Sequence, residues 1–188
     1  MAQIAIVYHS GYGHTEKQAE AVARGAGSVS GASAQLVRVA DAEAHWDDLA
    51  RADAIIFGSP TYMGGVSAPF KAFMDASSKV WATQGWKDKL AAGFTNSASQ
   101  SGDKLATLQH LAVYAAQQGM IWVGLGLMPG NNSSQGSVED INRLGGFLGA
   151  MAQSNNDQGP EFGPPPADLK TAELLGERVA KAAIRWRG

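Results

Sequence analysis

The stretch that decides the fold is Ile4-Ala5-Ile6-Val7-Tyr8, followed closely by Ser10-Gly11-Tyr12-Gly13-His14-Thr15. Its first five residues form an unbroken apolar run, which is typical of a strand buried on both faces of a sheet. From Thr15 to Ala26, good helix formers follow with a roughly helical apolar spacing. A buried strand, a glycine-containing loop and a helix, in this order, predict the first unit of a parallel α/β sheet.

The same alternation continues along the chain. Further strands are predicted at residues 36–39, 53–58, 90–95 and 120–125, and further helices at residues 46–51, 69–75, 105–118 and 169–186. Because right-handed crossovers place helices on both faces of such a sheet, we expect a doubly wound α/β sandwich with a five-stranded parallel sheet.

One long segment departs from this alternation. From Gly126 to about Pro166 the sequence is rich in Gly, Asn, Ser and Pro, which predicts an insertion or long loop after the fifth strand. A length of 188 residues favours one domain with an insertion, residues 1–188, over two domains.

The composition excludes several classes of function. The chain has no cysteine, which excludes disulfides, iron–sulfur clusters, thiolate zinc sites and thiol catalysis, so any redox chemistry must come from a bound cofactor. A net charge of -2 without blocks of like charge argues against nucleic acid as a partner. His9, His45 and His110 lie far apart without helical pairing, so no metal site is expected.

The N-terminus lacks the basic stretch and the small-residue cleavage site of a signal peptide. No apolar run approaches the roughly 20 residues that a membrane-spanning helix needs. From these features we expect a cytoplasmic protein without a membrane span.

Three loops follow the predicted strands one, three and four, at the edge where ligands bind doubly wound sheets. Loop one, Ser10–Thr15, offers free amides, hydroxyls and a helix N-terminus, which together favour a phosphate. It lacks the full G-x-G-x-x-G pattern of dinucleotide-binding folds and the G-K-[ST] ending of a P-loop. A plain turn with an N-cap at Thr15 is the alternative interpretation.

The other two loops indicate a flat, neutral ligand. Loop two, Gly58–Gly65, has a proline that fixes the chain and two glycines that let the backbone approach a planar ring. Loop three, Thr95–Asp103, supplies hydroxyls and amides with almost no charge, which suits a neutral ring and sugar hydroxyls better than a metal. Each loop is a weak signal alone, but the three converge at one sheet edge.

With these loops the chain resembles the flavodoxin-like FMN family, most closely the NAD(P)H:quinone oxidoreductases of the tryptophan-repressor-binding-protein (WrbA) type. The likeness covers nearly the whole chain and is carried by Ser10–Thr15, Gly58–Gly65, Lys71–Asp75, Lys79–Trp81, Gly93–Ser97 and Gly119-Met120. It departs at Tyr62-Met63, where the quinone reductases have Arg-Phe, and in loop three, which lacks their histidine.

The resemblance implies a set of residues that would bind FMN. The phosphate would be held by Ser10, Gly11, Tyr12, Gly13, His14 and Thr15. The isoalloxazine ring and the ribityl chain would be held by Pro60, Thr61, Tyr62, Met63, Gly64, Gly65, Thr95, Asn96, Ser97, Ala98, Ser99, Gln100 and Gly102. Trp81 would form a pocket wall above the ring, or would simply pack. No protein side chain is expected to act as the catalytic group, since the flavin N5 carries the chemistry.

The activity implied by the resemblance is transfer of a hydride from NAD(P)H, as co-substrate, through bound FMN to a quinone or a similar small-molecule acceptor. The family and the insertion also imply a homo-oligomer, a dimer or a tetramer. Three alternatives remain: a flavodoxin-type electron carrier, an NADPH-dependent FMN reductase from which FMN leaves, and a flavin-binding module without turnover.

Overall fold

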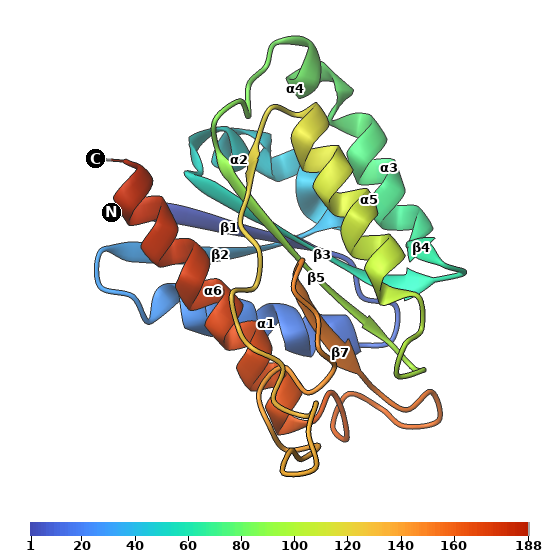
Figure 1. Ribbon diagram of the computed structural model, residues 1–188. Coiled ribbons are helices and arrows are strands. Elements are labelled where there is room, and N and C mark those ends of the chain that lie inside the picture. Colours follow the sequence, from blue (N-terminus) through green and yellow to red (C-terminus); the bar gives the residue numbers. More distant parts are fainter. Residues whose placement is uncertain (188) are drawn as a thin grey trace.

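A single sheet runs through the molecule in the strand order β2-β1-β3-β5-β6 (Figure 1). The computed structural model describes residues 1–187. The neighbours along this path are all parallel, which confirms the predicted doubly wound sheet. The strands are β1 (Ala2–Tyr8), β2 (Ala32–Arg38), β3 (Ala54–Tyr62), β4 (Gly65–Val66), β5 (Leu90–Ser97), β6 (Ile121–Trp122) and β7 (Ala150–Gln153).

Helices cover both faces of the sheet. They are α1 (His14–Gly27), α2 (Trp46–Arg51), α3 (Ala68–Ala76), α4 (Ser78–Ala82), α5 (Lys104–Gln117) and α6 (Pro166–Trp186), with a 3₁₀ helix at Val39–His45. Side chains alternate along β1: Ile4 and Ile6 pack in the core under α1 and α6, whereas Ala5 and Val7 pack in the core under α2, α3 and α5. The apolar run that opens the chain is therefore buried on both faces, as predicted.

The third strand is longer than predicted, and it absorbs most of loop two. β3 continues past Gly58 to Tyr62 because Ser59 and Pro60 pair with Thr95 and Asn96 of β5. The pairing of β3 with β1 ends at Gly58, so the absent N–H of Pro60 removes no bond to β1. Met63 and Gly64 then turn the chain with φ of 48° and 82°, as in a tight β-hairpin, and β4 returns antiparallel to β3.

Two short strands, β6 and β7, share the fifth position of the sheet beside β5, and the insertion begins between them rather than after a complete fifth strand. β6 pairs with the start of β5 (Leu90↔Ile121) and the chain then leaves the sheet; it returns as β7 on the second half of β5 (Phe94↔Ala150). The segment predicted as an insertion or long loop up to about Pro166 thus contains one strand, β7, that the sequence pattern does not predict. The four residues of β7, Ala-Met-Ala-Gln, include no β-branched or aromatic side chain and so carry little local strand signal; the pairing with β5 defines the strand.

A buried ion pair connects this returning strand to the last helix. Asp168, in the first turn of α6, accepts hydrogen bonds from Arg143 Nε at 2.8 Å and Arg143 Nη2 at 2.9 Å. It also accepts the backbone N–H of Gln153 at 2.9 Å. The side chains of Arg143 and Asp168 are 8% and 2% exposed, so both charges depend on this contact. The pair joins the insertion, β7 and α6 at one point.

Two glycines let α1 and α6 touch through their backbones. A Cβ atom on Gly25 would lie 1.8 Å from the carbonyl oxygen of Glu173, and one on Gly176 would lie 2.0 Å from that of Val22. Neither glycine has the positive φ that would itself require glycine. Close approach of the helices is therefore the reason for both.

Two further features bear on function. No helix within residues 1–187 has the length and hydropathy needed to cross a bilayer. In the same residues, no group of three or more His, Asp or Glu side chains is arranged to hold a metal ion.

We predict that Gly176→Ala destabilises the protein by about 2 kcal/mol, because the methyl group forces α6 away from α1 and overpacking outweighs the better helix propensity of alanine. Urea unfolding measures the change. Gly27→Ala is the matched control, since its Cβ atom would meet only Ala34 at 3.9 Å. Equal stability of the two variants would contradict the close packing.

We also predict that Asp168→Asn costs about 3 kcal/mol or more, because it leaves the buried guanidinium of Arg143 without its counter-charge. The same unfolding assay applies. Asp75→Asn breaks an exposed ion pair, in which the side chains of Lys71 and Asp75 are 46% and 69% exposed. This variant should cost less than about 1 kcal/mol of unfolding free energy. A similar small loss in both variants would show that the Arg143–Asp168 pair is not needed.

Candidate functional site

A cavity of about 460 Å³ lies at the carboxyl ends of β1, β3 and β5, where the three predicted loops meet. Its volume is in the range of small-molecule sites. Ten of the predicted residues line it: Ser10, Tyr12, His14, Thr15, Pro60, Thr61, Tyr62, Asn96, Ser97 and Ala98. None of the described residues that line it is Lys, Arg, Asp or Glu, so the cavity is polar without any carboxylate, ammonium or guanidinium group.

Loop one presents polar groups that have no partner within the protein. Ser10 Oγ and His14 Nε2 are both buried, and neither makes a hydrogen bond to any part of residues 1–187. Buried polar atoms without partners are costly, which indicates that a ligand satisfies them. Both atoms lie at the N-terminus of α1, where free amides and the helix dipole favour an anion.

The start of α1 is not capped by Thr15. The N-cap residue is Gly13, with φ of 88°, and no side chain caps the helix. The alternative of a plain turn with an N-cap at Thr15 is therefore wrong; Thr15 is buried within the first turn and lines the cavity. Gly13 is required by its backbone and by Pro160, whose ring would lie 2.7 Å from an added Cβ atom.

Loop two contributes a tyrosine that lies against loop one. A Cβ atom on Gly11 would lie 2.6 Å from the Tyr62 hydroxyl, and the ring of Tyr62 meets that of Tyr12 edge-on at 6.3 Å. Burial raises the pKa of the Tyr62 hydroxyl. Gly11 thus allows the contact between the loops, although it does not itself line the cavity.

Loop three is held in place by groups beneath it. Lys104 is fully buried and its Nζ donates to the carbonyls of Ser99 and Gln100 at 2.7 and 2.8 Å. Burial lowers the pKa of Lys104 to about 8. Gln153 Nε2 donates to the carbonyl of Ala98 at 2.8 Å, which connects the loop to β7 and to the Arg143–Asp168 pair.

Nine of the predicted binding residues do not line the cavity: Gly11, Gly13, Met63, Gly64, Gly65, Thr95, Ser99, Gln100 and Gly102. Met63 is fully exposed at the hairpin tip, because the extension of β3 moves the turn away from the cavity. Thr95 is fully buried and bonds Thr61 Oγ1 at 2.8 Å, so it supports a lining residue. Trp81 lines a different cavity, beside His110 and Tyr114.

Sequence reasoning missed the fourth wall of the cavity. It is formed after β7 by Ser154, Asn155, Asn156, Gln158 and Gly159. Ser154 Oγ bonds Asn96 Oδ1 at 3.2 Å, and Ser154 N donates to the carbonyl of Ser97 at the same distance. The signal in the sequence is the amide-rich run at 154–158, which lies within the segment predicted as an insertion.

A larger neighbouring cavity, of about 620 Å³, shares only Ser10 with the first. It contains Arg38, whose guanidinium binds Glu16 and the Tyr8 hydroxyl. Also here, His9 Nδ1 pairs with Ser67 Oγ at 2.8 Å, and burial lowers the pKa of His9. The guanidinium of Arg38 is thus already paired with a carboxylate, and the larger cavity includes only one of the three loops, through Ser10, whereas the smaller cavity is lined by all three loops.

Comparison with known proteins agrees with this geometry. The model of the NADPH-dependent FMN reductase family matches residues 9–133, more than half of the chain. Flavodoxin FldP of Pseudomonas aeruginosa is 45% identical over 96% of both chains, and an NAD(P)H dehydrogenase (quinone) of Geobacter sulfurreducens is 34% identical over 98% of this chain and 99% of that one.

Solved structures give the same assignment. The crystal structure of the flavodoxin, WrbA-like protein from Agrobacterium tumefaciens has 45% identity and a TM-score of 0.77 over 98% of this chain and 99% of that chain. A flavodoxin from the domain Archaea, 21% identical with a TM-score of 0.66, covers 97% of this chain and 99% of its own and shows the fold alone. The chain belongs to the NADPH-dependent FMN reductase family and has the flavodoxin-like fold of WrbA-type proteins.

Proposed function

We propose that this protein is an FMN-dependent oxidoreductase that passes a hydride from NAD(P)H to a quinone. The observation that carries the proposal is the pair of buried, unsatisfied groups, Ser10 Oγ and His14 Nε2, in an uncharged cavity at the carboxyl edge of the sheet. They fit a phosphate that is bound by hydroxyl, imidazole and amide groups without Lys or Arg. Family membership and the quinone dehydrogenase relatives support the same assignment.

When bound, FMN supplies the redox chemistry that none of the side chains can perform. Ser10 and His14, with the amides at the start of α1, would hold its phosphate. Tyr62 and Pro60 would pack against the ring, and Asn96, Ser97 and Ser154 would offer hydrogen bonds to the cofactor. The role of the protein is thus to orient the ring and to exclude water from it.

The proposal that a quinone accepts the electrons is based on relatives of the protein and not on any of its own side chains. The curated relatives at 32–34% identity are named NAD(P)H dehydrogenase (quinone), and this is the support for a quinone. The homo-oligomer and the role of Trp81 as a pocket wall stay predictions. Light scattering of the purified protein measures the first.

A second candidate function is electron carriage, because the relative at 45% identity is named a flavodoxin. A carrier docks its partners through a strongly charged face. The net charge of -2 gives little support for such a face, so we favour the enzyme.

Steady-state turnover tests the proposal. The protein is purified with FMN, freed of unbound flavin, and mixed with NADH or NADPH and benzoquinone. We expect bound FMN and oxidation of the nucleotide only when the quinone is present under anaerobic conditions. Bound FMN that neither nucleotide reduces would indicate a carrier, and turnover only with added free FMN would indicate a flavin reductase.

A second experiment tests the phosphate site independently of turnover. We predict that Ser10→Ala and His14→Ala each weaken FMN binding by about tenfold or more, since each removes a hydrogen bond to a charged group. Quenching of FMN fluorescence on titration measures the affinity. His110→Ala is the control, because His110 lies in the cavity beside Trp81. Unchanged affinity in both loop variants would place the phosphate elsewhere.

A further inference from the structure

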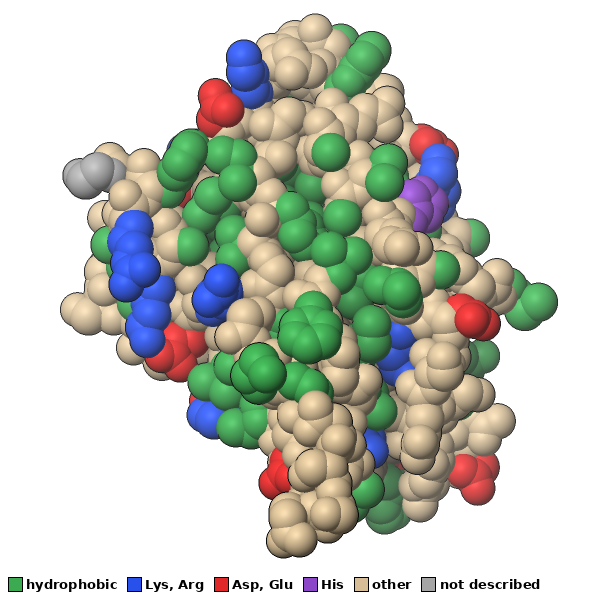
Figure 2. Space-filling view, in the orientation of Figure 1, with side chains coloured by type: hydrophobic (Ala, Val, Ile, Leu, Met, Phe, Trp, Pro, Cys, Tyr) green, Lys and Arg blue, Asp and Glu red, His purple; other side chains and the backbone are tan. Residues whose placement is uncertain are grey.

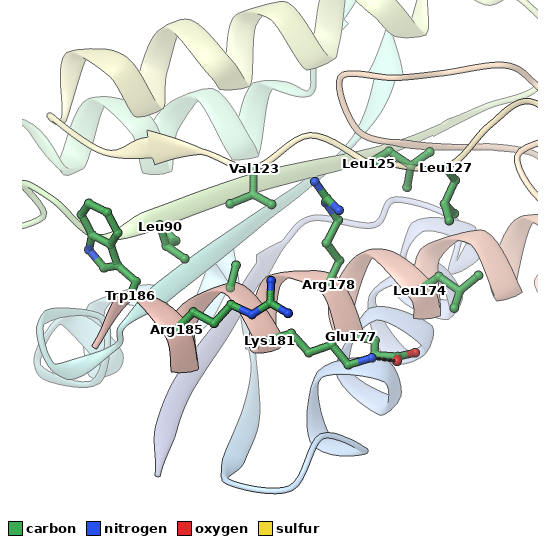
Figure 3. A pocket seen from close by; sticks show the side chains of 12 residues that line it. Leu90, Val123, Leu125, Leu127, Leu174, Glu177, Arg178, Lys181, Arg185 and Trp186 are labelled. Atoms are coloured by element: carbon green, nitrogen blue, oxygen red, sulfur yellow. Dashed lines mark hydrogen bonds and ion pairs between the residues drawn. The ribbon is translucent and has the colours of Figure 1, made fainter. Parts of the chain in front are cut away.

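A separate groove of about 530 Å³ lies between α6 and the edge of the sheet (Figure 3). It shares no lining residue with the cavity assigned to FMN. The groove exists because the chain leaves the sheet after β6, so the segment at residues 123–127 runs along the edge while α6 passes beneath it.

The floor of the groove is aliphatic. Leu90 comes from β5, Val123, Leu125 and Leu127 come from the edge segment, and Leu174 and Ala182 come from α6. Trp186 stands at one end, half exposed, with its indole N–H donating to the carbonyl of Asp88 at 3.0 Å. Such a floor takes up a hydrocarbon chain, because burial of apolar surface favours it.

The rim of the groove is basic. Arg178, Lys181 and Arg185 follow one another at helical spacing on the exposed side of α6, and the only carboxylate among the described lining residues is Glu177. Figure 2 shows basic side chains over α6, at the left of the view, beside a field of hydrophobic side chains. Three cations against one carboxylate stand out in a chain whose net charge is -2.

The three cations are not equally available. Arg178 Nε donates to the carbonyl of Gly124 at 2.9 Å, and its guanidinium covers Gly126, where an added Cβ atom would lie 2.5 Å from it. Arg178 therefore holds the edge segment against α6. Lys181 is paired with Glu177. Arg185 extends along α6 toward Lys181 (Figure 3) and, among the described residues that line the groove, is the cation left for an incoming anion.

We propose that this groove binds an amphipathic carboxylate, an aliphatic chain that lies on the Val123 and Leu125 side of the floor and ends in one carboxylate at Arg185. The volume matches that of sites for small molecules. A second copy of the chain is a poorer occupant, because a symmetric contact would bring these cations face to face. A protein partner would need about 800 Å² of surface, more than this floor of a few side chains provides.

Isothermal titration of the FMN-loaded protein with decanoate tests the proposal. We expect saturable binding of one decanoate per chain, and weaker binding of decanol, which lacks the charge, and of butyrate, which lacks the chain. Arg185→Gln should weaken decanoate binding by about tenfold, because it removes a charge-assisted hydrogen bond. Arg24→Gln, an exposed arginine of α1, is the matched control and should bind decanoate as the unaltered protein does.

A second variant tests the apolar part. Ala182→Phe fills the floor without changing the charge, so it should abolish decanoate binding while FMN remains bound. If that variant fails to fold, as circular dichroism would report, the Arg185→Gln comparison still decides. The proposal is overturned by absence of saturable decanoate binding, by equal binding of decanol, or by unchanged affinity in Arg185→Gln. It is equally overturned if decanoate does not bind and Ala182→Phe instead dissociates a dimer, which would show that the groove is a contact between two copies of the chain.

Discussion

The Arg143–Asp168 pair is the interaction on which the site depends most. It is buried at the start of α6, and the same carboxylate accepts the backbone N–H of Gln153 in β7. The chain has left the sheet for 27 residues by that point, since β6 ends at Trp122 and β7 begins at Ala150. Closing so long a loop costs chain entropy, and β7 is too short to repay it by pairing alone. Because either charge would be costly to bury alone, the chain return that brings Arg143 to Asp168 is favoured over one that leaves them apart.

This return builds the site. Once β7 lies on β5, Gln153 holds the carbonyl of Ala98, and Ser154 holds Asn96 and Ser97. The residues that follow close the cavity over loop one, where Pro160 packs on Gly13. Lys104 completes the support from below. Loop three therefore owes its shape to buried charges that lie outside the cavity, which is how the cavity itself remains uncharged.

The parts of the fold that the sequence predicts are those with local causes. The run from Ile4 to Tyr8 and the helix after loop one follow from apolar pattern and helix propensity, and the convergence of three loops follows from parallel topology. The extension of β3 through Pro60 is not predicted from the sequence, because it depends on two other strands. β1 stops pairing at Gly58, so Pro60 need not donate a hydrogen bond to it, while β5 continues to pair as far as Asn96. β7 and the wall at 154–159 were missed for the same reason: their positions are defined by partners more than 50 residues away, as in the Ser154–Asn96 contact.

The flavin cavity and the groove beside α6 offer different groups to a negatively charged ligand, dipoles in the first and cations in the second, so they are expected to bind different ligands. In the flavin cavity a phosphate would meet dipoles and a hydroxyl, since Lys104 and Arg143 are already committed to carbonyls and to Asp168. Recognition by fixed amides is directional and short-ranged, so it selects a ligand whose phosphate is attached at a defined distance from a flat ring. In the groove beside α6, Arg178 and Lys181 are already paired within the chain, and Arg185 is left at the rim of a floor that has no polar side chain. Such a site selects by charge and hydrophobic length, and it therefore does not compete for the flavin.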